Sequence, residues 1–489
     1  MKSLRYLYFR WNAQFREGEE GSLVEIASIK LINGKFNPKD MNQVLAILSQ
    51  RVCVDTVLVG SEALQLADRS VANHMRLMTG ISHNQRIFQT HSPSEPILAL
   101  GAARFLYNKN NTALGQVLNT FSDQLCEAGL VEKGLLGEFA GRILLTIARD
   151  LAAPKKSIGF GPDLLRPVLL MDFLDKLFGN KSWCGCRLDF NQAFDDTYVN
   201  FTHWIVTKDP LPEKPSRQLL GNLWARGGAL QCYSQQESLD LLIVTYKGSI
   251  AASAIFDVEN LSAAVVQIKY KVNADTEAGR GLRPMGISRN IHRPLPYIAL
   301  LMELGNESNH QGGTKSNPQI KVTASPLKDE DGDGFESLWK ERESAVKILH
   351  EYRANKEKEK TKTRKGGRAR DARETELEKK VEDAHAKIDA VNRFSICVRG
   401  ASPKVYGVLR EANIVREFKH LLEVTMPLPI TQDTTMKYMR PLERLDEASD
   451  HTAWMSLYGR GEDGGDGEGE SSMDVDFSPS LNPTMTLSL

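Results

Sequence analysis

Cysteine, long apolar runs and net charge are scarce or missing in this chain of 489 residues. The six cysteines are spread along the chain, which excludes a small disulfide-stapled fold and predicts free thiols in a reducing compartment. No apolar run approaches the roughly 18 residues of a membrane-spanning helix, and the N-terminus has no uninterrupted apolar signal segment. We therefore expect an intracellular protein that does not insert into a membrane.

Net charge is zero because 62 basic side chains balance 62 acidic ones, so the total charge does not point to a nucleic-acid partner. A phosphate-binding loop is also missing, since GGTKS at 312–316 has the lysine but not the GxxxxGK[ST] spacing. Cys184 and Cys186 form a C-x-C pair, but no second pair or suitably spaced histidines complete a zinc site.

Pattern and composition divide the chain into four parts. Residues 1–130 give mixed signals and no strong motif, so we expect a helical N-terminal region without an assigned role. Residues 131–304 together with 393–430 have the pattern of an α/β core. Residues 305–392 form a charged, partly helical insertion, and residues 431–489 form a C-terminal tail. The tail carries seven acids and no Lys or Arg from about residue 461, so we expect disorder from there.

The core region begins with an amphipathic helix at 131–152, in which glycines including Gly141 line a second face. Glycine inside a helix costs about 1 kcal/mol relative to alanine, so another element should pack close to the backbone there. Residues 165–206 are expected to be helical. Strands are expected at 229–234, 240–246, 263–270, 297–304 and 393–400, followed by a helix in 402–423. Near-continuous apolar strands flanked by helices predict an α/β fold with the sheet covered on at least one face.

A basic run, KEKEKTKTRKGGRAR, occupies residues 356–370 with eight basic and two acidic side chains. Such a run is either a solvated helix or linker, or a nucleic-acid contact or nuclear-localisation segment. The candidate nucleic-acid contacts in it are Lys362, Arg364, Lys365, Arg368 and Arg370.

Polar residues interrupt two of the apolar strands, in DLLIVTYKG from 240 and AAVVQIKYK from 263. Gln267 and Lys269 are two residues apart, so in a strand they project from the same face. Asp240 begins the preceding strand and can lie opposite them if the two strands pair. Mg²⁺ prefers oxygen ligands such as a carboxylate and an amide, and a nearby ammonium can stabilise charge on a phosphorane. The set therefore suits phosphodiester hydrolysis.

This D…QxK pattern on adjacent strands, after a helix carrying a glutamate, resembles the PD-(D/E)XK, or restriction-endonuclease-like, nuclease superfamily. The stretch from GLLGEFAGR to SPKVYGVL is similar to basidiomycete fungal proteins that are Crinkler-like or mobile-element-associated. The resemblance covers roughly 130–425. It implies a mixed sheet with an α-β-β-β-α-β core, flanked by helices, and a Mg²⁺ or Mn²⁺ cofactor acting on nucleic acid, with DNA expected.

The resemblance also implies residue roles. Asp240 is the principal metal ligand, Gln267 stands in the second-acid position, Glu138 is an outer metal-site acid, Lys269 is the catalytic lysine, and Arg226 lies near substrate phosphate. The sequence departs from the pattern because glutamine replaces the second acid and because Asp240 follows Glu138 by 102 positions (240 − 138), which requires an insertion. The ATPase motif that often precedes such a domain is also absent.

Other interpretations remain open. The chain can be an inactive nuclease-fold module that binds nucleic acid or a protein partner, or a relic of a decayed mobile gene. Asp240 can cap a strand and pair with Arg226, and Lys269 can lie at a sheet edge with its ammonium in solvent. Glu138 can form an exposed i,i+4 ion pair with Arg142.

Overall fold

The computed structural model describes residues 19–425 apart from 55, 60, 82–86, 94–95, 108–111, 127–135, 155–162, 165, 180–182, 208–210, 212–216, 234–238, 252–253, 270–294, 306–318, 325–331 and 361–371. The acidic tail lies outside the described residues. So do the five candidate contacts of the basic run, Lys362, Arg364, Lys365, Arg368 and Arg370.

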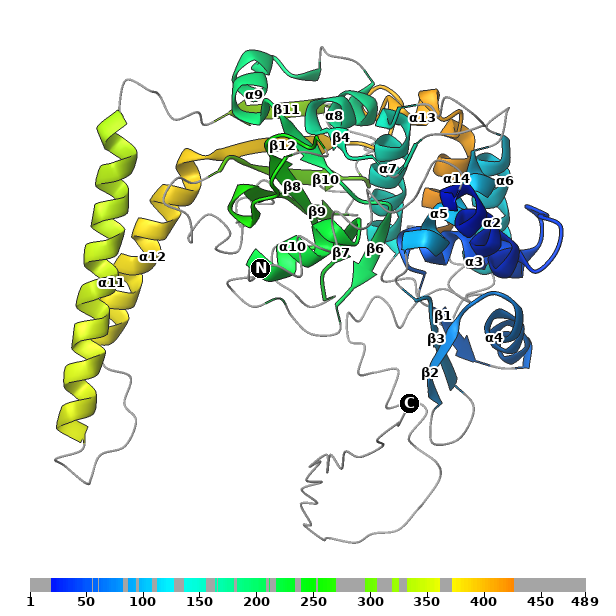
Figure 1. Cartoon of the computed structure of the whole chain (residues 1–489), viewed down its shortest axis with the longest axis horizontal. Coiled ribbons are helices and arrows are strands. Elements are labelled where there is room, and N and C mark those ends of the chain that lie inside the picture. The colour runs from blue at the N-terminus through cyan, green and yellow to red at the C-terminus, as the bar shows by residue number, and fades with distance from the viewer. Residues whose placement is uncertain are drawn as a thin grey trace, which may run out of the picture. The chain divides into compact units, whose positions relative to one another are not determined.

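A mixed β-sheet forms the centre of the fold, with helices on both faces (Figure 1). Its strands are β4 (Val168–Leu169), β5 (Thr197–Val199), β6 (His203–Val206), β7 (Gly228–Gln231), β8 (Leu241–Lys247), β9 (Leu261–Lys269), β10 (Tyr297–Glu303), β11 (Gln319–Ala324) and β12 (Arg393–Arg399). The order is β11-β12-β10-β9-β8-β5-β4, with β7 pairing both β8 and β6. The predicted α/β class with a mixed, helix-covered sheet is therefore confirmed.

The three strands β9, β10 and β12 run parallel, whereas β8 is antiparallel to β9 and β11 is antiparallel to β12. Buried residues alternate between two cores along each central strand. On β9, Val266 and Ile268 join the larger core, while Val265 faces the smaller one. Because side chains alternate with a period of two, Gln267 and Lys269 share the face of Val265.

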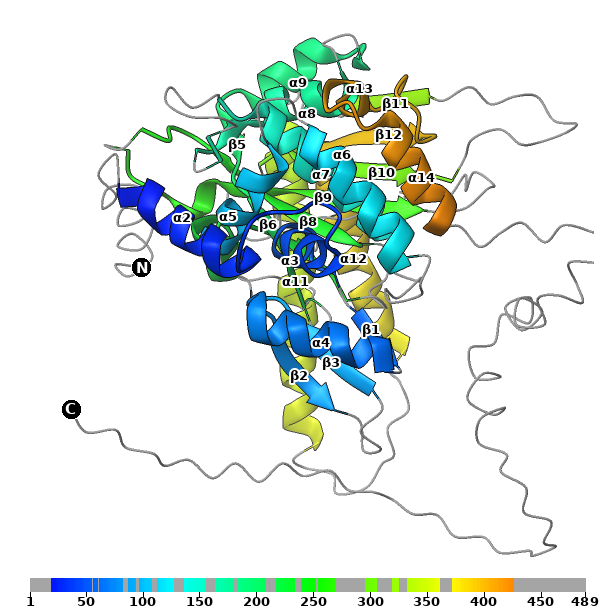
Figure 2. The same ribbon diagram turned by 90° about the vertical axis from the view of Figure 1, so that its right-hand side faces the viewer.

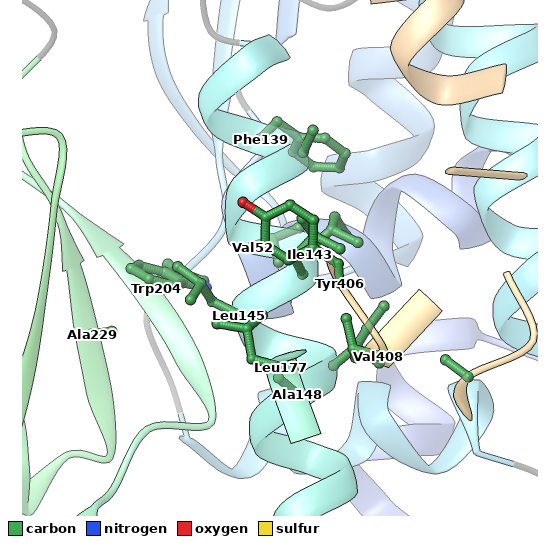
Figure 3. Packing of buried hydrophobic residues seen from close by; sticks show 14 of the residues in the cluster. Val52, Phe139, Ile143, Leu145, Ala148, Leu177, Trp204, Ala229, Tyr406 and Val408 are labelled. Carbon is green, nitrogen blue, oxygen red and sulfur yellow. The ribbon is translucent and has the colours of Figure 1, made fainter. Parts of the chain in front are cut away.

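The helices of the described residues are α2 (Glu19–Ile32), α3 (Met41–Val52), α4 (Ser61–Asn73), α5 (Pro96–Leu106), α6 (Thr112–Thr120), α7 (Leu136–Ala152), α8 (Leu170–Phe178), α9 (Arg187–Phe194), α10 (Arg217–Ala225), α11 (Gly332–Lys360), α12 (Ala372–Val391), α13 (Val408–Glu411) and α14 (Val415–Thr425). Buried residues of α7, α8, α9 and α14 contribute to the larger core, whereas α10 packs on the opposite face of the sheet. Figure 3 shows Phe139, Ile143, Leu145 and Ala148 along α7, among buried core residues from other elements that include Trp204 and Tyr406.

The segment 165–206 differs from its prediction as wholly helical. Alongside α8 and α9 it contributes the short strands β4, β5 and β6. The aromatic side chains of Phe190, Phe201 and Trp204 in this segment are buried. Trp204, however, lies on β6, which pairs with β7, and pairing with a distant strand is not visible in local periodicity.

The N-terminal region contributes helices to the larger core and also carries a separate three-stranded sheet. That sheet consists of β1 (Thr56–Val59), β2 (Leu77–Ile81) and β3 (Ile87–His91) in the order β1-β3-β2. Helices α3, α5 and α6 supply buried residues that cluster with those of α7 (Figure 2).

Arg51, at the end of α3, connects this region to the sheet-covering helix. It forms an ion pair with Asp150 of α7 and donates a hydrogen bond to the Thr202 carbonyl.

The charged segment after β10 contains both a strand and a helical hairpin. Strand β11 extends the sheet at β12, and α11 then packs against α12. Ion pairs link the two helices, as between Arg353 and Glu374 at 3.0 Å and between Lys387 and Glu341 at 2.8 Å. Within the described ranges, no helix is both long and apolar enough to cross a lipid bilayer.

Candidate active site

Asp240 and Gln267 meet where the antiparallel pair β8–β9 ends. Leu241 pairs with Val266, and the Asp240 amide donates to the Val266 carbonyl at 3.0 Å. One further step in this register places Asp240 opposite Gln267. Lys269 is the last residue of β9 and shares the face of Gln267. The structure therefore brings together the three residues whose convergence the strand spacing predicts.

The Asp240 side chain lies at the backbone of the neighbouring strand. Its Oδ2 accepts a hydrogen bond from the Ile268 amide at 2.5 Å, and its own carbonyl accepts one from the Cys232 amide at 2.8 Å. Burial raises the pKa of Asp240, whereas the Ile268 N–H and the Lys269 ammonium oppose that rise. Asp240 thus caps a strand end, as one interpretation expects, and is at the same time half-buried next to Lys269.

Helix α7 approaches β9 at a glycine. A Cβ atom on Gly141 would stand only 2.3 Å from the Ile268 Cδ1 atom, so a side chain at this position would force α7 away from the sheet. The close contact predicted from the glycine face is therefore found at Gly141. Glu138 lies three residues earlier, in the first turn of α7.

The Glu138 carboxyl lies within the electrostatic influence of the strand residues. Burial and, to a smaller extent, the Asp240 carboxylate raise the pKa of Glu138 to about 7, against the opposing charges of Arg142 and Lys269. Two partly desolvated carboxyls with an ammonium in their field match the roles that the resemblance implies for Glu138, Asp240 and Lys269.

Arg142 is not part of an exposed helix-surface ion pair. Its side chain is buried, and its Nη2 donates to the Cys53 carbonyl at 3.3 Å. Its guanidinium charge nevertheless lowers the pKa of Glu138, against the larger effect of burial. Glu138 therefore points into a charged, partly desolvated environment.

Glu303 and Arg399 extend the charged group onto the next two strands, and the sequence analysis missed both. Lys269 pairs with Glu303 across β9 and β10, and Glu303 pairs with Arg399 across β10 and β12. The Glu303 carboxylate is buried and accepts a hydrogen bond from Arg399 Nε at 2.8 Å. The sequence feature that could have indicated Glu303 is a single carboxylate at the end of the apolar strand YIALLME. A carboxylate at the start of an apolar strand drew attention to Asp240 in the same way.

Arg226 lies apart from this group. It is exposed and follows α10, just before the first residue of β7. Asp240 contacts Cys232, which follows the last residue of the same strand. The structure therefore places Arg226 at the opposite end of β7 from Asp240, and its charge acts instead on the buried His203.

A basic strip lies on the outer strands of the sheet. The charges of Arg399, Lys321 and Arg393 all act on the Cys397 thiol, and Lys321 is the register partner of Cys397. Lys321 and Thr323 of β11 are exposed, while Ile320 and Val322 pack on the opposite face. This strip shares its sheet face with Glu303 and Lys269.

Asp240, Glu138 and Gln267 carry oxygen donors of the type that a hard divalent cation prefers. Asp240 has a second carboxylate oxygen besides the one bound to Ile268, and Glu138 and the Gln267 amide supply further oxygens. A cation would relieve the repulsion that helps to raise the pKa of Glu138. The described ranges contain no group of three or more His, Cys, Asp or Glu side chains able to hold a metal. An amide and waters would therefore complete the shell, which suits Mg²⁺ and not Zn²⁺.

Comparison with known proteins gives one match. Residues 35–276 match a family described as a domain of unknown function, DUF8736. The matched range contains Glu138, Asp240, Gln267 and Lys269, and it ends before Glu303 and Arg399. Neither the curated proteins nor the solved structures gave a match.

Proposed function

We propose that this protein hydrolyses phosphodiester bonds in nucleic acid, with DNA as the expected substrate, using a divalent metal ion. The observation that carries the proposal is the pairing of β8 with β9, which places Asp240 opposite Gln267 and near the end of β9 that carries Lys269. Asp240 raises the pKa of Glu138, and the Lys269 charge counteracts the rise at both carboxyls, so the three groups lie within one another's fields. These are three of the four residues to which the superfamily resemblance assigns the chemistry.

In this proposal Asp240, Glu138 and the Gln267 amide would hold Mg²⁺ or Mn²⁺. The bound ion would act as a Lewis acid on the scissile phosphate and on the attacking water. The hydrogen bond from the Ile268 amide fixes one carboxylate oxygen of Asp240 and thereby orients the other. The carboxylate would then need no reorganisation when the reaction takes place.

Lys269 would position the attacking water and stabilise the negative charge that develops on the phosphorane. The water oxygen bonds to phosphorus as the bond to the leaving sugar oxygen breaks, and the leaving oxygen takes up a proton. Glu303, the register partner of Lys269, would hold the ammonium on this face, with Arg399 fixing the Glu303 carboxylate in turn. Glu303 is thus a positioning residue in this scheme.

The basic strip of Lys321, Arg393 and Arg399 would receive the sugar-phosphate backbone, since phosphate contacts supply most sequence-independent affinity. The strip continues along the same sheet face to Lys269. Arg226, for which the resemblance implies this role, lies at the other end of β7.

The order of elements supports a restriction-endonuclease-like arrangement. Helix α7 is followed by β7, β8 and β9 in antiparallel pairing and then by β10 parallel to β9. The helices α8, α9 and α10 and the strands β4–β6 lie between α7 and β7, which accommodates the long separation of Glu138 from Asp240. A parallel crossover between neighbouring strands needs a dozen or more residues. The crossover from β9 to β10 includes residues 270–294, which lie outside the described ranges.

A second candidate function is a binding module without catalysis. One observation favours it: Asp240 already has a structural task as the acceptor for the Ile268 amide, which explains a carboxylate here without any metal. The glutamine at 267 also lowers the negative charge of the site. Such a module would bind nucleic acid through the basic strip and would retain this binding when the carboxylates are replaced.

Nicking of supercoiled plasmid by the full chain is the direct test. We expect the wild type to convert supercoiled to open-circular DNA with Mg²⁺ or Mn²⁺, and to stop when EDTA removes the ion. Conversion that continues unchanged in EDTA contradicts a metal-dependent site. Absence of nicking with either ion, on plasmid and on single-stranded substrates, favours the binding module.

The pH dependence of nicking should report Glu138. A metal ligand must be deprotonated, and the pKa of Glu138 is raised to about 7, so activity should fall as pH drops below 7, by about tenfold per pH unit at low metal concentration. Because protons and metal compete for one carboxylate, higher Mg²⁺ should move the midpoint to lower pH.

Glu138→Gln should remove that competition and show low activity without the metal-dependent shift of the midpoint. Glu423→Gln, an exposed carboxylate on α14, is the matched control and should leave the profile unchanged. A wild-type midpoint that does not move with metal concentration argues against Glu138 as a ligand.

A further inference from the structure

Two thiols outside the proposed site lie side by side in the connection between α8 and α9. The Sγ atoms of Cys184 and Cys186 are 3.5 Å apart. Cys184 is buried in the larger core, whereas Cys186 is half-buried at the position that precedes α9. Between them Gly185 faces open space, since a Cβ there would meet nothing within 4 Å. Cys186 is therefore partly exposed, whereas Cys184 is buried.

The residues on either side hold this pair in place. Asp175 of α8 accepts a hydrogen bond from the Trp183 indole at 2.9 Å and forms a two-point ion pair with Arg187 at 2.6 and 2.7 Å. Trp183 also packs against Phe178, with ring centroids 5.0 Å apart. Both ends of the short segment are thus anchored to α8, which keeps the two sulfur atoms adjacent.

Metal binding does not account for the pair. The described residues place no third His, Cys, Asp or Glu beside the two thiols in a metal-binding arrangement, and a structural zinc site needs four ligands. Burial, strengthened by the neighbouring Cys186, raises the pKa of Cys184 to about 12, so this thiol stays protonated and unreactive until a partner sulfur is presented to it. A short contact between two thiols, one of them partly exposed, is instead the geometry of a dithiol that can be oxidised.

We propose that Cys184 and Cys186 form a reversible intramolecular disulfide, with a small-molecule disulfide such as oxidised glutathione as the oxidant. In the first step the Cys186 sulfur attacks glutathione disulfide, giving a mixed disulfide and one glutathione. In the second step Cys184 attacks the Cys186 sulfur as its proton passes to the departing glutathione thiolate, which releases the second glutathione. Two protein thiols are oxidised and one glutathione disulfide is reduced, so electrons and protons balance.

The structure also indicates where oxidation acts. A disulfide requires sulfur atoms about 2.05 Å apart, so the contact must shorten and draw Cys186 toward the core. Cys186 precedes α9, and Phe190 and Phe194 of that helix each pack against Phe394 of β12 with centroids 4.9 Å apart. Oxidation therefore acts on the packing between α9 and the sheet, and it does so whether or not the proposed nuclease site is active.

Glutathione redox buffers with a rising oxidised fraction, applied to the full reduced chain, test the proposal. After quenching, denaturation and alkylation, peptide mass spectrometry should find neither Cys184 nor Cys186 alkylated and their shared peptide lighter by two hydrogens. The other four of the six cysteines should remain alkylated, and added dithiothreitol should restore all six.

Three variants separate the steps. Cys184→Ser should accumulate a glutathione adduct on Cys186, because the resolving thiol is gone, whereas Cys186→Ser should leave Cys184 reduced. Cys397→Ser, another partly exposed thiol, should behave as the wild type. A lasting glutathione adduct on wild-type Cys186, or a disulfide that joins other cysteines, would overturn the proposal. The proposal would also be overturned if the wild type stayed fully reduced in the same buffers in which the Cys184→Ser variant acquires a glutathione adduct.

Discussion

Lys269→Ala should lower metal-dependent plasmid nicking by about 10²–10³-fold, the loss typical of removing one group that stabilises transition-state charge. The ammonium lies at the end of β9, within the field of both Glu138 and Asp240. Initial rates of nicking, measured at saturating Mg²⁺, give the effect directly. Metal affinity should change little, because Lys269 is not a ligand.

Lys419→Ala is the matched control, since Lys419 is an exposed lysine on α14 whose partner is Glu423. It should nick as the wild type does. Equal rates for Lys269→Ala and wild type would remove Lys269 from the mechanism. If neither variant nor wild type cuts, binding of labelled DNA decides. Affinity that survives Lys269→Ala and falls steeply with salt supports the binding module.

Asp150→Ala should cost about 3–5 kcal/mol of unfolding free energy, because it breaks a buried ion pair and leaves its partners uncompensated. Asp150 forms an ion pair with Arg51 and accepts a hydrogen bond from the Tyr107 hydroxyl at 2.6 Å. Arg149 lies 3.9 Å away, and burial lowers its pKa to about 10 even though Asp150 opposes that effect. Without Asp150, the guanidinium groups of Arg51 and Arg149 would be buried without this carboxylate to balance their charge.

Urea denaturation followed by circular dichroism measures this loss. The control is Asp163→Ala, which removes a carboxylate paired at the surface with Arg166 at 3.2 Å and should cost no more than about 1 kcal/mol. The same experiment tests how the N-terminal region is joined to the core, because Arg51 and Tyr107 come from that region. Similar losses for the two variants would show that the buried network contributes little.

The candidate site has one carboxylate fewer than the PD-(D/E)XK pattern that the sequence resembles, because Gln267 stands in the position of the second acid. Glu303 supplies an acid close by, yet it is committed to Arg399 and pairs with Lys269 along the sheet. We infer that Glu303 positions Lys269 and does not replace the missing acid. Activity, more than the arrangement of residues, is therefore what the nicking assay will decide.

Local patterns in the sequence were enough to predict most of the central elements. Apolar runs predicted β7, β8, β9, β10 and β12 to within three residues at each end, and a helical period predicted α7. The period of two along β9 put Gln267 and Lys269 on one face, and the glycines of α7 predicted the close contact found at Gly141. These features depend on neighbours a few residues apart, which is why a single sequence reveals them.

Only the tertiary structure decided which distant residues join the site. Glu303 lies beside Lys269, and Arg399 beside Glu303, because β9, β10 and β12 pair in parallel across connections that no local period specifies. Arg226 lies away from Asp240 because Arg226 precedes the start of β7, whereas Asp240 lies where β8 pairs with the end of β7. The segment β6 is a strand because it pairs with β7. Strand register is set by hydrogen bonds and packing between segments far apart in the chain. The sequence by itself therefore determined the individual helices and strands, and the tertiary structure determined which of them lie next to one another.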